Sequence, residues 1–220
     1  MIRRPAACIV ALALFIAQPA LAFDSPLSSE AIREAYFLGQ HRDDSTTRYL
    51  EQYIQRLAPP KTGPHIASIE FRTPFAQLVR LSSQHSVGYS AQQAEKDHRS
   101  QAEFVEISIE ILLTESYPAV LSQPPPARSA STPGYRLRSP DFWRDFEVTV
   151  FQGEKELEAH HLHGSPNYTC SDDGGCALIG ATIWLDFPAA AFESSGSATV
   201  SIEPPQGDPV AVEFDLTRLR

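Results

Sequence analysis

The chain has few cysteines and no surplus of positive charge. Three cysteines occur in 220 residues, and 18 Lys plus Arg stand against 27 Asp plus Glu, which gives a formal charge of −9. Nucleic-acid binding relies on clustered basic residues that displace counterions from phosphates. The charge balance therefore argues against a nucleic-acid partner. The hydrophobic fraction of 42% is typical of a folded globular protein.

Long hydrophobic runs are also missing, except for one near the N-terminus. Two arginines precede an apolar run over residues 8–17, and a small-x-small sequence follows that ends at Ala22. This order is typical of a secretory signal peptide, so we expect residues 1–22 to be removed by cleavage between Ala22 and Phe23. The run is about half of the roughly 20 residues that span a bilayer. We therefore expect an exported mature chain, periplasmic or secreted, without a membrane span.

Once the leader is removed, Cys170 and Cys176 are the remaining cysteines, and they flank a Gly-rich turn. Two cysteines at the end of a hairpin can bring their Cβ atoms together, and an exported protein meets an oxidising compartment. The spacing therefore predicts a disulfide that closes a hairpin. The turn also contains Asp172 and Asp173, but the chain lacks the spaced carboxylates of an EF-hand loop, so a polar turn is the simpler interpretation.

Helical patterns come first in the mature chain. A serine cap predicts a helix that ends before Gly39, a residue type that often follows helix C-termini. Asp44 can cap a second helix, in which apolar residues recur at helical spacing as far as Leu57, and two prolines follow. We expect residues 23–60 to form an N-terminal helical hairpin.

Strand patterns dominate the rest of the chain. In residues 105–111, branched apolar residues alternate with Glu106, Ser108 and Glu110, as in an antiparallel sheet with one buried and one solvated face. Similar segments bring the count to about seven strands, with short inserted helices between them. We predict a mainly β fold, an immunoglobulin-like antiparallel β-sandwich over residues 61–220. A Pro-rich stretch over residues 123–134 predicts a long surface loop.

Histidines are densest in the sequence His160-His161-Leu162-His163. In a strand, His161 and His163 share a face, and their spacing would let both imidazoles bind one metal ion. The remaining ligands would have to come from other histidines, such as His65, His85 and His98, or from carboxylates, and no spacing selects among them. A solvated strand end explains the same residues, so no cofactor is expected, and a metal ion is the alternative.

Signatures of catalysis are missing from the sequence. It contains no Gly-x-Ser-x-Gly elbow, no Gly-rich phosphate loop and no dinucleotide fingerprint. The leading hypothesis is therefore a non-enzymatic binding or assembly module with a protein or glycan partner at the cell envelope. One alternative is a metal-binding protein or metal-dependent enzyme that uses His161 and His163. A second alternative is a carbohydrate-binding module with Trp143 at its ligand surface, because exposed aromatic rings stack on sugars.

Overall fold

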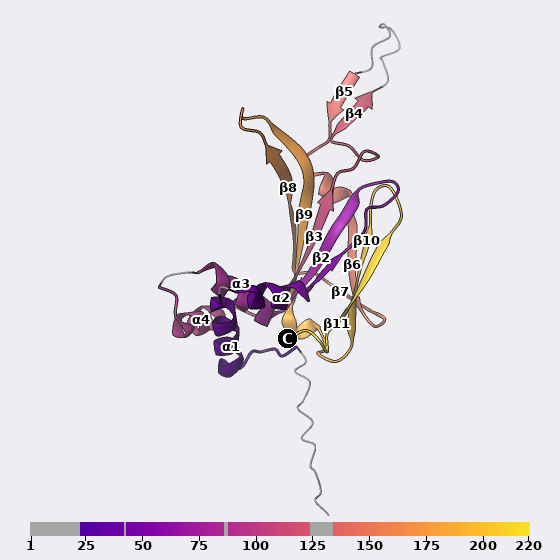
Figure 1. The fold of residues 1–220 in the computed structure, drawn as a ribbon. Helices are drawn as coiled ribbons and strands as arrows, with labels where there is room; N and C mark the ends of the chain where they lie inside the picture. The colour runs from indigo at the N-terminus through magenta and orange to yellow at the C-terminus, as the bar shows by residue number, and fades with distance from the viewer. Residues whose placement is uncertain (1–22, 42, 86–87, 124–133) are drawn as a thin grey trace, which may run out of the picture.

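The computed structural model describes residues 23–41, 43–85, 88–123 and 134–220. The expected leader and most of the Pro-rich stretch lie outside these residues. The described part is a mixed α/β protein with several antiparallel sheets and a group of helices at one end of them (Figure 1). It contains eleven strands, more than the seven or so predicted, because several strands of three or four residues are too short to show a period in the sequence.

The largest sheet has five antiparallel strands in the order β1-β2-β3-β9-β8. Their bounds are β1 Ile54–Arg56, β2 His65–Arg72, β3 Phe104–Leu112, β8 His161–Cys170 and β9 Cys176–Pro188. A second sheet has the order β11-β10-β6-β7, with β6 Glu147–Gln152, β7 Lys155–Leu157, β10 Ser197–Glu203 and β11 Val210–Asp215. A separate hairpin consists of β4 Val120–Gln123 and β5 Gly134–Leu137.

The main core lies between the five-stranded and four-stranded sheets. The alternation predicted for residues 105–111 is confirmed for the apolar face of β3, because its four branched apolar side chains are fully buried. The opposite face is less solvated than predicted: Glu110 is exposed, but Ser108 is 7% exposed, because Arg72 and Glu70 lie against it. Ile109 on β3 lies opposite Ile69 on β2 and Ile183 on β9, and Val150 and Val200 contribute from the second sheet. The two sheets therefore bury one face each against the other.

Four helices form a smaller layer with its own core (Figure 1). They are α1 Ser29–Gln40, α2 Asp44–Glu51, α3 Pro74–Gln84 and α4 Ala91–Arg99. Ser28, Thr73 and Ser90 cap α1, α3 and α4, since each side-chain oxygen accepts a backbone N–H of the first turn. The buried residues of this core come from residues 27–35 and 75–94, so helix packing crosses residue 60.

Three details of the helical prediction are wrong. The cap of α2 is Asp43, whose side chain accepts the Ser45 N–H at 2.9 Å, and Asp44 is the first residue of the helix. The second helix ends at Glu51 rather than near Leu57, because the following residues pair with β2 as strand β1, and the Leu57 N–H donates to the Ala67 carbonyl at 3.0 Å. Gly39 lies inside α1 rather than after it. The reason is a close helix crossing, since a Cβ at Gly39 would lie 2.3 Å from the Val79 carbonyl oxygen on α3.

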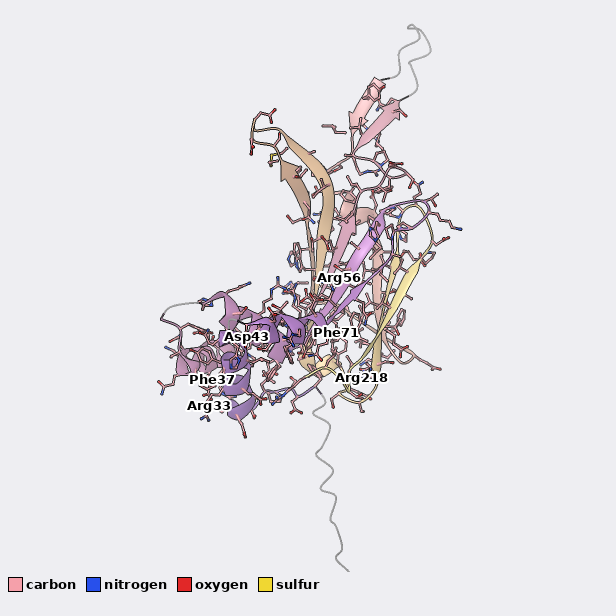
Figure 2. The ribbon with its side chains drawn as sticks, viewed as in Figure 1. Arg33, Phe37, Asp43, Arg56, Phe71 and Arg218 are labelled. Carbon is pink, nitrogen blue, oxygen red and sulfur yellow. A yellow bond between two sulfur atoms is a disulfide. The ribbon has the colours of Figure 1, made fainter. Side chains whose placement is uncertain are left out.

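Long-range contacts join the helical layer to the sheets. The Tyr53 hydroxyl donates to the Arg220 carbonyl at 3.1 Å, and the Thr73 hydroxyl donates to the same oxygen. The Arg220 guanidinium pairs with Glu34 on α1. Phe71, at the base of the five-stranded sheet near the helices (Figure 2), is fully buried. The contacts of Arg220 therefore tie the end of the chain to α1 and to the cap of α3.

Candidate functional site

Polar side chains cover the face of the five-stranded sheet that points away from the main core, which we call the outer face. Because directly paired residues share a face, the strand register places Arg72, Glu106, Asp186 and His161 in one row across β2, β3, β9 and β8. The next row consists of Glu70, Ser108, Trp184 and His163. The outer face therefore gathers charged groups that lie far apart in the sequence.

A buried ion-pair network occupies the β2–β3 side of this face. The Arg72 side chain is 13% exposed, and it donates to Glu70 at 2.6 Å and also to Glu106. Burial by itself would lower the pKa of the Arg72 guanidinium, but the two carboxylates outweigh burial and raise it. Burial raises the pKa of Glu106, Arg72 lowers it, and Asp186 and Glu70 raise it again, so that the net direction is upward.

The structure brings His161 and His163 together on the outer face. Both are exposed residues of β8. His161 lies opposite Asp186, and the His163 imidazole stacks on the Trp184 indole with ring centroids 5.0 Å apart. This stacking holds the His163 ring of β8 against the Trp184 ring of the neighbouring strand β9. The pair therefore forms part of a polar and aromatic surface.

The three other histidines named as further metal ligands are each engaged elsewhere. His65 contacts the Leu57 carbonyl at 2.9 Å, His85 contacts the Leu81 carbonyl at 2.8 Å, and His98 contacts Glu103 at 2.8 Å. Within the described residues, no three His, Cys, Asp or Glu side chains are grouped so that they could bind one metal ion.

Trp143 does not lie at a surface, which contradicts the prediction of a ligand-binding ring there. Its side chain is 4% exposed and lies beneath Gly164 of β8, where a Cβ would approach the indole to 2.3 Å. Glycine at this position lets the strand pass directly over the ring, and the turn over η1 Phe142–Asp145 places the ring there. The tryptophan that reaches the outer face is Trp184, which the sequence analysis did not single out.

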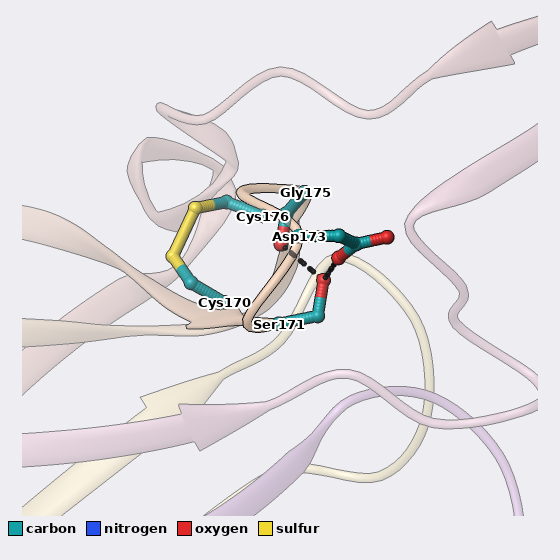
Figure 3. Close-up of a disulfide and its surroundings, with 5 residues drawn as sticks. All are labelled: Cys170, Ser171, Asp173, Gly175 and Cys176. Atoms are coloured by element: carbon teal, nitrogen blue, oxygen red, sulfur yellow. Dashed lines mark hydrogen bonds between the residues drawn. A yellow bond between two sulfur atoms is a disulfide. The ribbon is translucent and has the colours of Figure 1, made fainter.

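The two cysteines are bonded, as predicted. Cys170 and Cys176 pair at the end of the β8–β9 hairpin with a Cα–Cα distance of 4.1 Å (Figure 3). In the turn between them, the Ser171 hydroxyl donates to Asp173 and lies 3.1 Å from the Gly175 carbonyl. The hydrogen bond from Ser171 lowers the pKa of the Asp173 carboxyl. This carboxylate therefore accepts its hydrogen bond from within the turn.

The β4–β5 hairpin, which we call the arm, extends away from the two packed sheets (Figure 1). Tyr135 and Leu137 are 73% and 75% exposed, and Val120, 49% exposed, is the cross-strand partner of Leu137. Alternation along β5 places all three on one face of the arm, while Arg136 points to the other. At its base, the Arg138 guanidinium lies 3.4 Å above the ring of the buried Tyr117.

No helix among the described residues is long and apolar enough to cross a membrane. No protein-family model matches the chain, and no curated protein is similar to it in sequence. Solved structures with distant likeness include IgNAR antibody domain C1, at 9% identity over 73% of this chain and 99% of that one, with a TM-score of 0.30. IgNAR antibody domain C3 has the same TM-score at 13% identity over 70% of this chain and 95% of that one. Scores this low do not establish a shared fold.

Proposed function

We propose that the protein is a non-enzymatic binding or assembly module of the cell envelope and that the arm docks against a partner protein. The observation that carries the proposal is the exposed face of Val120, Tyr135 and Leu137. A hairpin of two strands is marginally stable alone in water and gains stability when another surface covers its apolar face. Tyrosine is among the residue types enriched at the anchors of protein interfaces, so Tyr135 is the anchor of this face, with Val120 and Leu137 as its apolar surroundings.

Export is part of the same proposal. It is supported by the leader-like sequence that ends at Ala22 and by the pairing of Cys170 with Cys176, since disulfides persist in oxidising compartments. A mature chain that begins at Phe23 would keep the aromatic ring of this residue, which is 3% exposed in the main core. The face-to-face packing of the two antiparallel sheets supports the finer proposal of an immunoglobulin-like sandwich.

Site-specific photo-crosslinking in the cells that naturally make the protein tests the docking face. A photoreactive residue is placed at Tyr135, with position 136 as the matched control, because Arg136 is exposed on the opposite face of the same strand. We expect a discrete adduct from position 135 in the envelope fraction and none from position 136. The adduct should disappear when Leu137→Ser is added, because this change removes the neighbouring apolar side chain from the same face.

Two results would contradict the proposal. Equal adducts from positions 135 and 136 would show that contact with the arm is non-specific, and no adduct from position 135 would show that the face is not covered. An adduct with the mass of two copies of this chain would show that the arm contacts a second copy of the chain and not a foreign partner. N-terminal sequencing of the protein from the envelope fraction tests export independently, and we expect Phe23 as the first residue.

A further inference from the structure

A cavity lies where the helical layer meets the outer face. Its volume is about 280 Å³, near the lower end of the range for small-molecule sites, and its walls come from α3, the end of α4 and the start of β3. Arg72 and Glu106, the first members of the charged row on the outer face, line it. The cavity is thus continuous with the buried ion-pair network and is separate from the arm.

Two arginines offer this cavity a site for an anion. Arg72 lines the cavity and is held between Glu70 and Glu106; its Nε has no hydrogen-bond partner among the described residues, but this atom is shielded from solvent and is out of a ligand's reach. The charge of Arg72 nevertheless attracts an anion in the cavity. Arg80 is 43% exposed, and the nearest carboxylate oxygens of Glu70 lie 3.4 Å away, so its guanidinium is only loosely held. Guanidinium groups bind carboxylates strongly when they donate through two N–H groups.

Three carboxylates line the cavity, and Glu106 is the one that belongs to the ion-pair network. Glu103 accepts hydrogen bonds from the Leu27 backbone and the Ser25 hydroxyl and contacts His98, and Asp97 accepts from the Gln93 amide at 2.6 Å. Among the described residues, Glu106 accepts from Arg72 alone, and its pKa is raised because burial disfavours its charged form. A ligand ammonium group beside Glu106 would stabilise the ionised carboxylate.

The remaining wall is apolar and partly exposed. Leu78 is 3% exposed and Leu81 is 39% exposed, and both face the cavity from α3. Leu81 is one of the few large apolar side chains that the described surface leaves uncovered. Contact with an aliphatic group would remove part of its area from water, at about 25 cal/mol for each Å².

We propose that the cavity binds a small zwitterion with an aliphatic side chain, a free α-amino acid. The ligand carboxylate bonds to Arg80 and is attracted by the charge of Arg72, the ammonium group lies against Glu106, and the side chain packs on Leu78 and Leu81. The cavity has room for a molecule of this size, and the two arginines and Glu106 together favour one that carries both charges. This site does not depend on the envelope partner proposed for the arm.

Calorimetric titration of the mature chain with L-leucine tests the inference. Leucinamide, which lacks the carboxylate, and N-acetyl-leucine, which lacks the ammonium group, are the matched analogues. We expect saturable binding of leucine and a loss of affinity of about tenfold or more for each analogue. No saturable binding of leucine, valine or methionine up to about 10 mM would overturn the proposal, and so would an analogue that binds as tightly as leucine.

A pair of arginine variants tests the assigned residues. Arg80→Gln should weaken leucine binding about tenfold or more, because it removes the loosely held guanidinium, and it should leave leucinamide binding unchanged. Arg48→Gln is the control, since Arg48 lies on α2 with a side chain that is 81% exposed. Leucine binding to Arg80→Gln with the affinity of the unchanged protein would refute the site. The Leu137→Ser arm variant should bind leucine normally, so failure of the arm proposal and failure of this one are distinguishable.

Discussion

Replacing Gly39 by alanine is the sharpest test of how the helical layer is assembled. The residue lies within α1, its φ is not in the left-handed region, and α3 passes beside it. An added Cβ would lie 2.3 Å from the Val79 carbonyl oxygen and 2.7 Å from the Ser82 Cβ. The backbone carbonyl cannot rotate away, so one helix must move outward. Gln40 opposes that movement, because its side chain donates to the Ser82 carbonyl at 2.6 Å.

The expected change in stability follows from two opposing effects. In an uncrowded helix interior, Gly→Ala stabilises by about 0.5–1 kcal/mol, because alanine loses less conformational freedom on folding. Overpacking a close contact costs about 1–3 kcal/mol. We therefore expect Gly39→Ala to lower the free energy of unfolding by about 1–2 kcal/mol, measured by urea denaturation of the mature chain.

A double variant distinguishes the close crossing from a simple helix-end role for Gly39. Ser82→Gly removes one of the three atoms that the new Cβ would meet. The cost of Gly39→Ala should then be smaller in the Ser82→Gly background, with a coupling of about 0.5 kcal/mol or more. A stabilising Gly39→Ala would refute the close crossing, and so would a cost that Ser82→Gly leaves unchanged.

Three further predictions concern the cap, the disulfide and the ion pair of the fold. Thr73→Ala should lower stability by about 1–2 kcal/mol in urea denaturation, because the fully buried Thr73 caps α3 and also bonds to the last residue; a loss within error would contradict this role. Replacing both Cys170 and Cys176 by serine should lower the free energy of unfolding by about 2 kcal/mol, because the disulfide no longer closes a short loop in the unfolded chain. A loss far above this value would show that the hairpin end supports the main core. The Arg220 hydrogen bond lowers the pKa of Glu34 from 4.5, so the stability from this pair is fully present above pH 4.5 and is lost as the pH falls through the lowered pKa. The difference in the free energy of unfolding between the unchanged protein and Glu34→Gln should therefore shrink as the pH falls from about 7 to about 3. A difference that stays constant would exclude the ion pair as its source.

The sequence predicts those elements whose burial repeats at a regular interval. The alternation on β3 is unambiguous because the main core covers one of its faces along the whole strand. The cap of α1 is equally local, since it depends on the Ser28 side chain and a backbone N–H three residues away. Local signals of this kind are sufficient to predict the start of this helix and the strand.

Long-range pairing overrides local spacing where the prediction is wrong. Residues 53–57 have apolar side chains at helical spacing, yet β2 offers a free edge, and strand pairing satisfies the backbone groups of this segment. The Tyr53 hydroxyl reaches the Arg220 carbonyl, 167 residues away in the sequence. No window of a few residues contains such a contact, so the spacing around Leu57 could not reveal the end of the helix.

The charged row on the outer face shows why a site of this kind is hard to predict. Glu106 and Glu110 are equivalent in the sequence, because both alternate with branched apolar residues on β3, and both are expected to face water. The structure separates them: Glu110 remains exposed, whereas Glu106 lies at the end of the strand where α3 and α4 cover the sheet. The difference comes from the crossing of the helical layer, which depends on close contacts such as that at Gly39. If that crossing opens, Arg80 and Leu81 move with α3, so a change at Gly39 should weaken binding in the cavity without touching any residue that lines it.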